Sequence, residues 1–168
     1  RIVLSPADIE QGFELANKAF DMADCWQVPV TILTDQYFVD SYYNVPGIDV
    51  GHHAPERKII RTGKDYKRYS ITDDGISPRG IPGYGNGIVK MDSDELDVSG
   101  HITESMDVRV QMVEKRKRKL KTILEGSLPP TVIGDGKGVI ILCWGSTFNI
   151  VKEAAEELEG VTIVHLPQ

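Results

Sequence analysis

The sequence predicts an α/β protein built on parallel strands and interrupted by a long polar segment. Residues 2–34 and residues 139–166 each follow the order strand, helix, strand. In residues 2–34, the helix that connects the two strands predicts that they lie parallel. Between these parts, residues 74–87 contain five glycines and two prolines, which cannot propagate a helix and weaken a strand. We therefore predict that residues 74–87 form an ordered loop, the kind of segment that carries a site.

Composition and charge narrow the class of protein. The 168 residues are 40% hydrophobic and 26% charged, a balance typical of a folded globular protein. The net charge of −6 argues against a nucleic-acid-binding protein. The longest apolar run, Val139–Trp144, is too short to cross a membrane. The sequence starts in a strand without a methionine, so we expect it to be part of a longer polypeptide.

The cysteines indicate a cellular compartment and exclude one kind of cofactor site. Cys25 and Cys143 lie in apolar surroundings without the spacing of a metal-binding pair. We expect two buried thiols in a reducing, cytoplasmic compartment. Two cysteines are also too few to hold an iron–sulfur cluster, which usually takes four.

The first regular part begins with a strand at Ile2–Leu4. Ser5 is the expected N-cap of the following helix, and Pro6 suits its first position. The spacing of apolar residues predicts one buried helix face, made of Ile9, Phe13, Ala16, Phe20 and Ala23. The second strand is expected at Val28–Thr34, parallel to the first.

Polar residues follow the second strand directly. Asp35, Gln36 and Tyr37 stand just past its carboxyl end, the edge at which open α/β sheets bind ligands. The alternative, which we favour for Asp35, is that it caps a turn. Residues 40–73 are expected to be extended, with short strands. The adjacent His52 and His53 suit a solvent-exposed pair better than a metal site.

The segment after the glycine-rich loop is predicted to hold a brief strand, an acidic turn and a helix. We expect the strand at Ile88–Met91, and residues 92–97 do not match a calcium-binding loop. Thr103 is the expected helix N-cap, with Glu104 in the first turn. Val110, Val113, Leu120 and Leu124 mark the expected buried face. Six of the seven residues from Lys115 to Lys121 are basic; we favour a solvated helix face over an anion-binding one.

The last part returns to α/β structure after Pro129 and Pro130. Val139–Trp144 is the expected buried strand, residues 150–159 the helix, and Val161–Leu166 the closing strand. The turn at residues 145–147 places Ser146 at a helix N-terminus, where capping is commoner than anion binding. His165 is expected to be packed rather than a ligand. Residues 134–136 spell Gly-Asp-Gly but lack the downstream asparagine of a thiamine diphosphate motif, so a turn is predicted.

Several stretches together resemble a known family, the alpha subunits of 2-oxoacid:ferredoxin oxidoreductases, and in particular the 2-oxoglutarate branch. The resemblance runs over nearly the whole chain. The most specific stretches are Gly-Ile-Ser-Pro-Arg at residues 75–79 and Gly-His-Ile-Thr-Glu at residues 100–104. Residues 28–37, 66–69, 92–95 and 144–147 also match in order and spacing.

This resemblance implies a division into three segments. Residues 1–40 would be the C-terminal part of a pyrimidine-binding thiamine domain with a parallel sheet. Residues 41–128 would form a linker that contains the glycine- and proline-rich loop and the basic helix. Residues 129–168 would start a transketolase C-terminal-like domain.

The resemblance also implies an activity, its cofactors and its partners. Such enzymes oxidatively decarboxylate a 2-oxoacid, here expected to be 2-oxoglutarate, and transfer the acyl group to coenzyme A. Thiamine diphosphate with Mg²⁺ would be shared with a beta subunit, and iron–sulfur clusters on partner subunits would pass electrons to ferredoxin. Gamma and delta subunits are further possible partners. No nucleic acid, membrane or metal site on this chain is implied.

The loop supplies the candidate substrate-binding residues, because a guanidinium fork suits a carboxylate. Arg79 is the first candidate, with Ser77 and Asp74 beside it in the same loop. An equally weighted alternative is that Arg79 forms an ion pair with an acidic side chain of its own subunit. Asp35, Gln36, Tyr37 and His101 are the residues expected at the subunit or cofactor interface. No catalytic residue is assigned on this chain.

A second function from another class stays open. The chain could be a non-catalytic α/β assembly subunit whose glycine- and proline-rich loop only docks a partner. Dependence of the reaction on Arg79 would separate the two functions.

Overall fold

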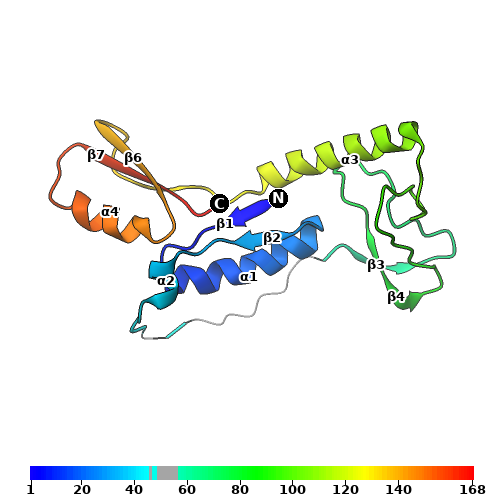
Figure 1. The fold of residues 1–168 in the computed structure, drawn as a ribbon, viewed down its shortest axis with the longest axis horizontal. Coiled ribbons are helices and arrows are strands. Elements are labelled where there is room, and N and C mark those ends of the chain that lie inside the picture. The colour runs from blue at the N-terminus through cyan, green and yellow to red at the C-terminus, as the bar shows by residue number, and fades with distance from the viewer. Residues whose placement is uncertain (46, 49–56) are drawn as a thin grey trace. The chain divides into compact units, whose positions relative to one another are not determined.

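The computed structural model describes residues 1–45, 47–48 and 57–168, which form two compact units. Unit 1 contains residues 1–23, 28–55 and 127–168, and unit 2 contains residues 24–27 and 56–126. Figure 1 labels their helices and strands. His52 and His53, predicted to be an exposed pair, lie outside the described residues.

Unit 1 opens with the predicted strand–helix–strand unit. Strands β1 (Ile2–Leu4) and β2 (Val30–Ile32) are parallel, with Ile2 opposite Val30. Helix α1 (Ile9–Trp26) connects them, and its last residues belong to unit 2. The predicted parallel pairing is confirmed, although β2 is shorter than the seven residues expected.

The start of α1 corrects the predicted cap. The hydroxyl of Ser5 donates to the carbonyl of Leu33 at 3.1 Å, so Ser5 links the chain to the end of β2 instead of capping the helix. Asp8 accepts a hydrogen bond from the Gln11 N–H at 2.9 Å, and the Gln11 side chain accepts one from the Ala7 N–H. This pattern resembles a capping box, except that Gln11 accepts from the residue before Asp8 and not from Asp8 itself.

The buried face of α1 also differs from the predicted one. Leu15, Ala19 and Met22 are buried, whereas Phe20 is 77% exposed. The apolar residues of this helix are spread over more than one face, so their spacing alone did not identify the buried one. Leu15 belongs to the core of unit 1, together with the fully buried Ile2 and Leu4 of β1.

A second sheet in unit 1 has the strand order β5-β7-β6. The two predicted strands β6 (Val139–Trp144) and β7 (Val161–Leu166) are present and parallel, and helix α4 (Thr147–Ala155) connects them. Strand β5 (Thr131–Ile133), which was not predicted, pairs antiparallel with β7. Helix α4 begins three residues before the predicted start and ends before Leu158, which is exposed.

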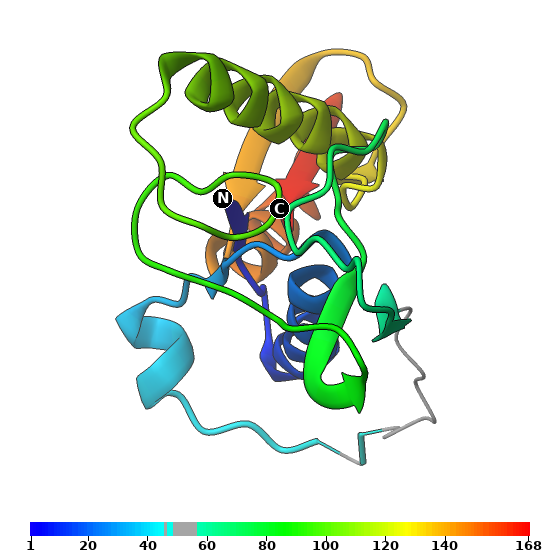
Figure 2. The ribbon, with the colours of Figure 1, turned by 90° about the vertical axis from the view of Figure 1, so that its right-hand side faces the viewer.

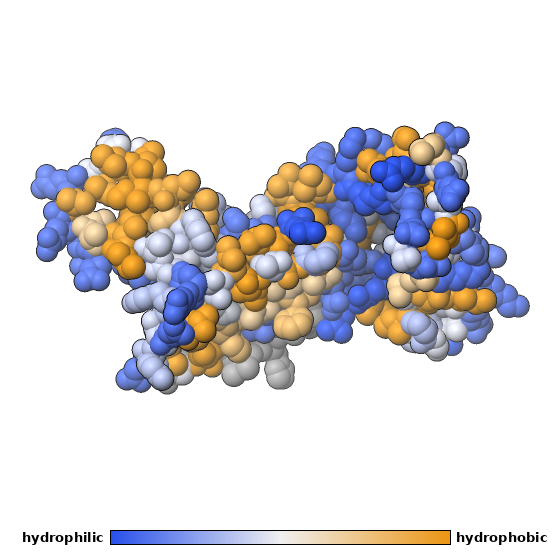
Figure 3. All heavy atoms as spheres, viewed as in Figure 1, coloured by the Kyte–Doolittle hydropathy of each residue, from blue (hydrophilic) through white to orange (hydrophobic). Residues whose placement is uncertain are grey.

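One face of this sheet is apolar and uncovered among the described residues. Ile140, Leu142 and Trp144 of β6 are all more than half exposed, whereas Cys143 is buried. Figure 3 shows the apolar atoms gathered over β6 and β7. The predicted buried strand is therefore present, but most of its side chains are not buried. Cys25, the other cysteine, is only half-buried.

Unit 2 holds the glycine- and proline-rich segment, part of which is a strand rather than a loop. Strand β4 (Arg79–Gly85) is parallel to β3 (Ile59–Thr62), and the register shifts between Ile60 and Thr62. A Cβ atom on Gly80 would lie 2.4 Å from the Thr62 Cγ2 atom, and one on Gly85 would lie 2.3 Å from the Thr62 carbonyl oxygen. The glycines that weaken a strand in isolation thus permit the close approach of β3 here.

The chain between β4 and α3, green in Figure 2, corrects two further predictions. Residues 88–91 are not a strand. Helix α3 (Met106–Glu125) is capped by Ser105, which accepts from the Val108 N–H, and not by Thr103. Glu104 consequently precedes the helix instead of lying in its first turn.

Helix α3 turns an unexpected face to the core of unit 2. Met112, Lys115 and Ile123 are buried, whereas Val110, Leu120 and Leu124 are more than half exposed. The basic run is therefore not simply a solvated face, because Lys115 is only 7% exposed. Among the described residues, no helix is long and apolar enough to cross a membrane.

Candidate functional site

The turn that leads into β4 is held by the side chain of Asp74. One carboxylate oxygen accepts a hydrogen bond from the Ile76 N–H at 2.9 Å, and the other forms an ion pair with Lys58. Burial acts to raise the pKa of Asp74, but the hydrogen bonds from Lys58 and from Ile76 outweigh it and lower the pKa to about 2. Asp74 is therefore a charged anchor of the turn.

Ser77 is almost completely buried and connects the turn to α3. Its hydroxyl donates to the carbonyl of Ser70 at 2.8 Å and accepts a hydrogen bond from the ammonium group of Lys115. Lys115 also donates to the carbonyl of Tyr69 at 3.1 Å. Burial, followed by repulsion from Lys119 and nearby arginines, lowers the pKa of Lys115 to about 8.

Arg79, the candidate substrate-binding residue, has a carboxylate partner within unit 2. Its Nη2 atom lies 3.0 Å from Asp24 Oδ1, and Arg57 Nε lies 2.9 Å from the other oxygen of Asp24. The structure thus contains the intrasubunit ion pair that was one of the two alternatives. Within residues 1–45, 47–48 and 57–168, the Nε and Nη1 groups of Arg79 donate no hydrogen bond, so the guanidinium keeps donors for a second anion.

The hydroxyl of Tyr66 fixes the backbone on both sides of Arg79. It donates to the Pro78 carbonyl at 3.1 Å and accepts from the Gly80 N–H at 2.6 Å. A Cβ atom on Gly80 would lie 2.9 Å from the Tyr66 ring, so this arrangement requires a glycine there. Sequence reasoning did not assign this role to Tyr66, whose signal was only its place within the resemblance.

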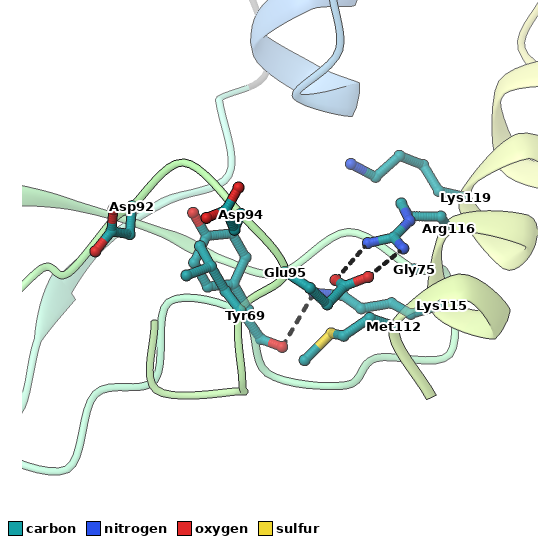
Figure 4. A pocket seen from close by; sticks show the side chains of 10 residues that line it. Tyr69, Gly75, Asp92, Asp94, Glu95, Met112, Lys115, Arg116 and Lys119 are labelled. Atoms are coloured by element: carbon teal, nitrogen blue, oxygen red, sulfur yellow. Dashed lines mark hydrogen bonds and ion pairs between the residues drawn. The ribbon is translucent and has the colours of Figure 1, made fainter. Parts of the chain in front are cut away.

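A pocket of about 270 Å³ opens beside Lys115 in unit 2. Figure 4 shows acidic side chains on one side of it and basic side chains of α3 on the other. Arg116 binds both carboxylate oxygens of Glu95 at 2.9 Å, and this bond lowers the pKa of Glu95. Asp92 and Asp94 also line the pocket. The predicted acidic turn is thus partly paired with the helix.

In unit 1, polar residues meet at the carboxyl ends of two strands. Asp35 follows β2 and Ser146 follows β6, and the Ser146 hydroxyl donates to Asp35 Oδ2. Asp35 also caps the short helix α2 (Gln36–Asp40) by accepting from the Phe38 N–H at 2.8 Å, which confirms the favoured capping role. The hydrogen bonds from Ser146 and Phe38 hold the pKa of Asp35 below its usual value.

Removal of the Asp35 carboxylate is expected to lower the thermal stability of the chain at neutral pH. Asp35→Ala loses two hydrogen bonds and Ser146→Ala loses one, so Asp35→Ala should lower the Tm more. In a double-mutant cycle measured by thermal unfolding, Ser146→Ala should lower the Tm little further once Asp35→Ala is present, because the bond that it removes is already lost. Asp40→Ala, which removes only an exposed bond from Gln36, is the control.

The same interaction predicts how this stability depends on pH. A lowered folded pKa means that Asp35 stabilises the fold above its unfolded pKa of about 4 and that this stability is lost as the pH falls through the folded value. The difference in Tm between the wild type and Asp35→Ala should therefore shrink in acid. Strictly additive effects in the cycle, or a pH-independent difference, would contradict the bond to Ser146.

The remaining predicted interface residues are not brought to one place. Tyr37 is 60% exposed on α2, and Gln36 donates to Asp40 on the same helix. His101 lies in unit 2, where it contacts Asp97 and Lys90. The interface role of these residues stays a prediction.

No cluster of three or more potential metal-ligating side chains occurs within the part of the chain that the structure describes. The Gly-Asp-Gly segment is the predicted turn, with Asp135 accepting from the Lys137 N–H at 3.0 Å and Gly136 donating to Thr162. These residues do not fit a Mg²⁺–diphosphate site. His165 is packed as predicted: it is fully buried, and its ring stacks on Phe148.

Comparison with known proteins identifies the protein family to which the chain belongs. Residues 1–115 match the family model described as pyruvate flavodoxin/ferredoxin oxidoreductase, thiamine diP-binding. The chain belongs to this family, so the predicted resemblance and the α/β fold class are confirmed.

Particular relatives refine this assignment. The 2-oxoacid:ferredoxin oxidoreductase 1 subunit alpha of Sulfurisphaera tokodaii is 32% identical over 94% of this chain, and the subunit alpha of Saccharolobus solfataricus is 34% identical over 95%. The chain spans only 26% of the length of each. A solved 2-oxoglutarate:ferredoxin oxidoreductase from Magnetococcus marinus, with 2-oxoglutarate, coenzyme A and succinyl-CoA bound, matches 99% of this chain and 30% of its own, at 27% identity and a TM-score of 0.80.

Proposed function

We propose that this chain is part of the alpha subunit of a 2-oxoacid:ferredoxin oxidoreductase that acts on 2-oxoglutarate. The observation that carries the proposal is the Gly-Ile-Ser-Pro-Arg turn, which presents a partly exposed Arg79 from a rigid support. The family match and the likeness to the Magnetococcus marinus enzyme support it. The reaction is the oxidative decarboxylation of the 2-oxoacid, with transfer of the acyl group to coenzyme A and of electrons to ferredoxin.

In this proposal the chain binds and orients the substrate, and its partners hold the redox groups. Thiamine diphosphate, when bound with Mg²⁺, stabilises the carbanion left by decarboxylation. The described residues do not fit its Mg²⁺–diphosphate site, so we assign that site to a beta subunit and the iron–sulfur clusters to partner subunits. The division of residues 1–40, 41–128 and 129–168 into two thiamine-family domains and a linker belongs to the same proposal.

Arg79 is proposed to bind a carboxylate of the substrate. Asp24 holds one end of the guanidinium, and Tyr66 holds the backbone on either side, so the remaining N–H groups point in a fixed direction. A fixed guanidinium loses less conformational entropy on binding a carboxylate than a free one. Asp24 thus orients Arg79, and the ion pair and the substrate role are compatible. Ser77 and Asp74 act through the turn: Ser77 is buried and Asp74 is paired with Lys58, so both position Arg79.

Reconstitution tests the activity itself. The full-length subunit, co-expressed with its thiamine-binding partner, should reduce a viologen dye in a coenzyme-A-dependent way with 2-oxoglutarate and much more slowly with pyruvate. A stable complex that reduces no dye with any 2-oxoacid would contradict the proposal and favour the assembly subunit.

Substitution of Arg79 tests the assigned role. In the reconstituted complex, Arg79→Ala should raise the KM for 2-oxoglutarate roughly 10- to 100-fold, as expected for loss of a charge-assisted bond. Arg57→Ala is the matched control, because Arg57 pairs with the same Asp24 but lies 54% exposed. An unchanged KM in Arg79→Ala, or an equal rise in Arg57→Ala, would contradict the substrate-binding role. Arg79 would then serve only in the ion pair with Asp24.

A further inference from the structure

A second, smaller pocket in unit 2 is lined by basic side chains. Its volume is about 100 Å³, and its charged lining residues are Arg68, Lys115 and Lys119. Ser77, Gln27 and Tyr69 supply polar and aromatic walls. No acidic side chain lines this pocket, in contrast to the larger one beside it.

The three cations retain hydrogen-bond donors that the described residues do not use. The ammonium group of Lys115 contacts the Tyr69 carbonyl and the Ser77 hydroxyl, which leaves one of its three N–H groups. Lys119 makes one long contact of 3.4 Å, with the Gln27 carbonyl. Arg68 donates from Nη2 to the Gln27 side chain at 2.9 Å and lies over the Tyr69 ring, and its other N–H groups donate no hydrogen bond within the described part of the chain.

The acidic side chains near this pocket are paired with other cations. Asp74 is paired with Lys58, and Glu95 binds Arg116 through both oxygens. Burial and mutual repulsion lower the pKa values of both Lys115 and Lys119. Gathering three cations around a cavity without an anion is unfavourable, and a bound anion would remove that repulsion.

We propose that the pocket lined by Arg68, Lys115 and Lys119 binds a phosphate group. Lys115 is the fixed element, because it is buried and held by Tyr69 and Ser77. Lys119, one turn further along α3, and Arg68, from the segment between β3 and β4, complete the lining of the site. Three separate donors match a tetrahedral group with several acceptor oxygens and nearly two negative charges better than a planar carboxylate with one.

The phosphate could be a free anion or part of a larger molecule. A pocket of about 100 Å³ accommodates a phosphate group but not a nucleoside, so any larger ligand extends out of it. Coenzyme A carries both a diphosphate and a ribose phosphate. Only this identification of the source rests on the proposed function, and the pocket itself does not.

Calorimetric titration of the reconstituted complex with inorganic phosphate tests the site. Lys119→Gln should weaken phosphate binding about tenfold, as expected for one charge-assisted bond. Lys117→Gln removes the same charge from α3 at a position that is 66% exposed and paired with Glu114, and it should leave the affinity within about twofold. Arg68→Gln is a second variant that leaves α3 unchanged, and it should weaken binding as Lys119→Gln does. Absence of phosphate binding by the wild type, or equal effects of Lys119→Gln and Lys117→Gln, would overturn the proposal.

Titrations with coenzyme A and dephospho-coenzyme A identify the source. A ribose phosphate in the pocket predicts that Lys119→Gln weakens coenzyme A binding but not dephospho-coenzyme A binding, whereas the diphosphate predicts weaker binding of both. Unchanged affinity for both, with weakened inorganic phosphate, assigns the pocket to a free anion. Each pattern supports the site. A complex that binds phosphate as described but oxidises no 2-oxoacid would contradict the proposed function, and it would still support phosphate binding in the pocket.

Discussion

Replacement of Gly75 by alanine is expected to destabilise unit 2 by about 2–4 kcal/mol. Gly75 has a φ of +74°, a conformation that is unfavourable for residues with a Cβ atom. Its added Cβ would lie 2.4 Å from the Lys115 carbonyl oxygen and 2.5 Å from the Lys119 backbone nitrogen. These are backbone atoms in the middle of α3, so neither can move aside without disturbing the helix.

Urea denaturation, monitored by tryptophan fluorescence, measures the loss of stability that Gly75→Ala causes in unit 2. The chain has two tryptophans, of which Trp26 lies in unit 2 and Trp144 in unit 1. In a Trp144→Phe background, the tryptophan fluorescence therefore comes from Trp26 in unit 2 alone. Gly63→Ala is the control, because no atom lies within 4 Å of its added Cβ and its φ is not positive. Equal transition midpoints for Gly75→Ala and Gly63→Ala would show that the turn does not pack against α3 as described.

The second large effect is a dependence of stability on alkaline pH that originates from Lys115. Its folded pKa is about 8, below the value of about 10.4 in an unfolded chain. Between these values the unfolded chain binds more protons, so the free energy of unfolding should rise as the pH increases from 8 to 10.4. The rise from this group is on the order of 3 kcal/mol. Below pH 8, the folded state bears the full unfavourable energy of the buried charge.

Comparison of wild type with Lys115→Met isolates this contribution from other groups that titrate in the same range. Methionine has a similar length and is readily buried, so the variant should fold and lose the rise between pH 8 and 10.4. Lys117→Met, at the exposed position, should keep it. Denaturation curves in the Trp144→Phe background, recorded at several pH values, give the slopes. Identical slopes for wild type and Lys115→Met would mean that Lys115 is solvated in the folded state.

The order of secondary structure followed from local sequence patterns. Alternation of short apolar runs with helical spacing predicted β1, α1 and β2, and again β6, α4 and β7, and it predicted the parallel pairing of β1 with β2. Such patterns are local, because the backbone bonds of a helix and the periodicity of its side chains arise within a few turns. The segment around Arg79 could likewise be predicted to carry a site, because its glycines and prolines lie close together in the sequence.

Long-range packing determined the features that the local patterns misassigned. Residues 79–85 form a strand because Thr62 and Tyr66, far along the chain, fit against the missing side chains of Gly80 and Gly85. Lys115 is buried although its neighbours in sequence are charged, because the Tyr69 carbonyl and the Ser77 hydroxyl lie where its ammonium group can bind them. A buried cation is tolerated only when such partners are in place. Their positions depend on residues about 40 apart in sequence, beyond the reach of any helical or strand period.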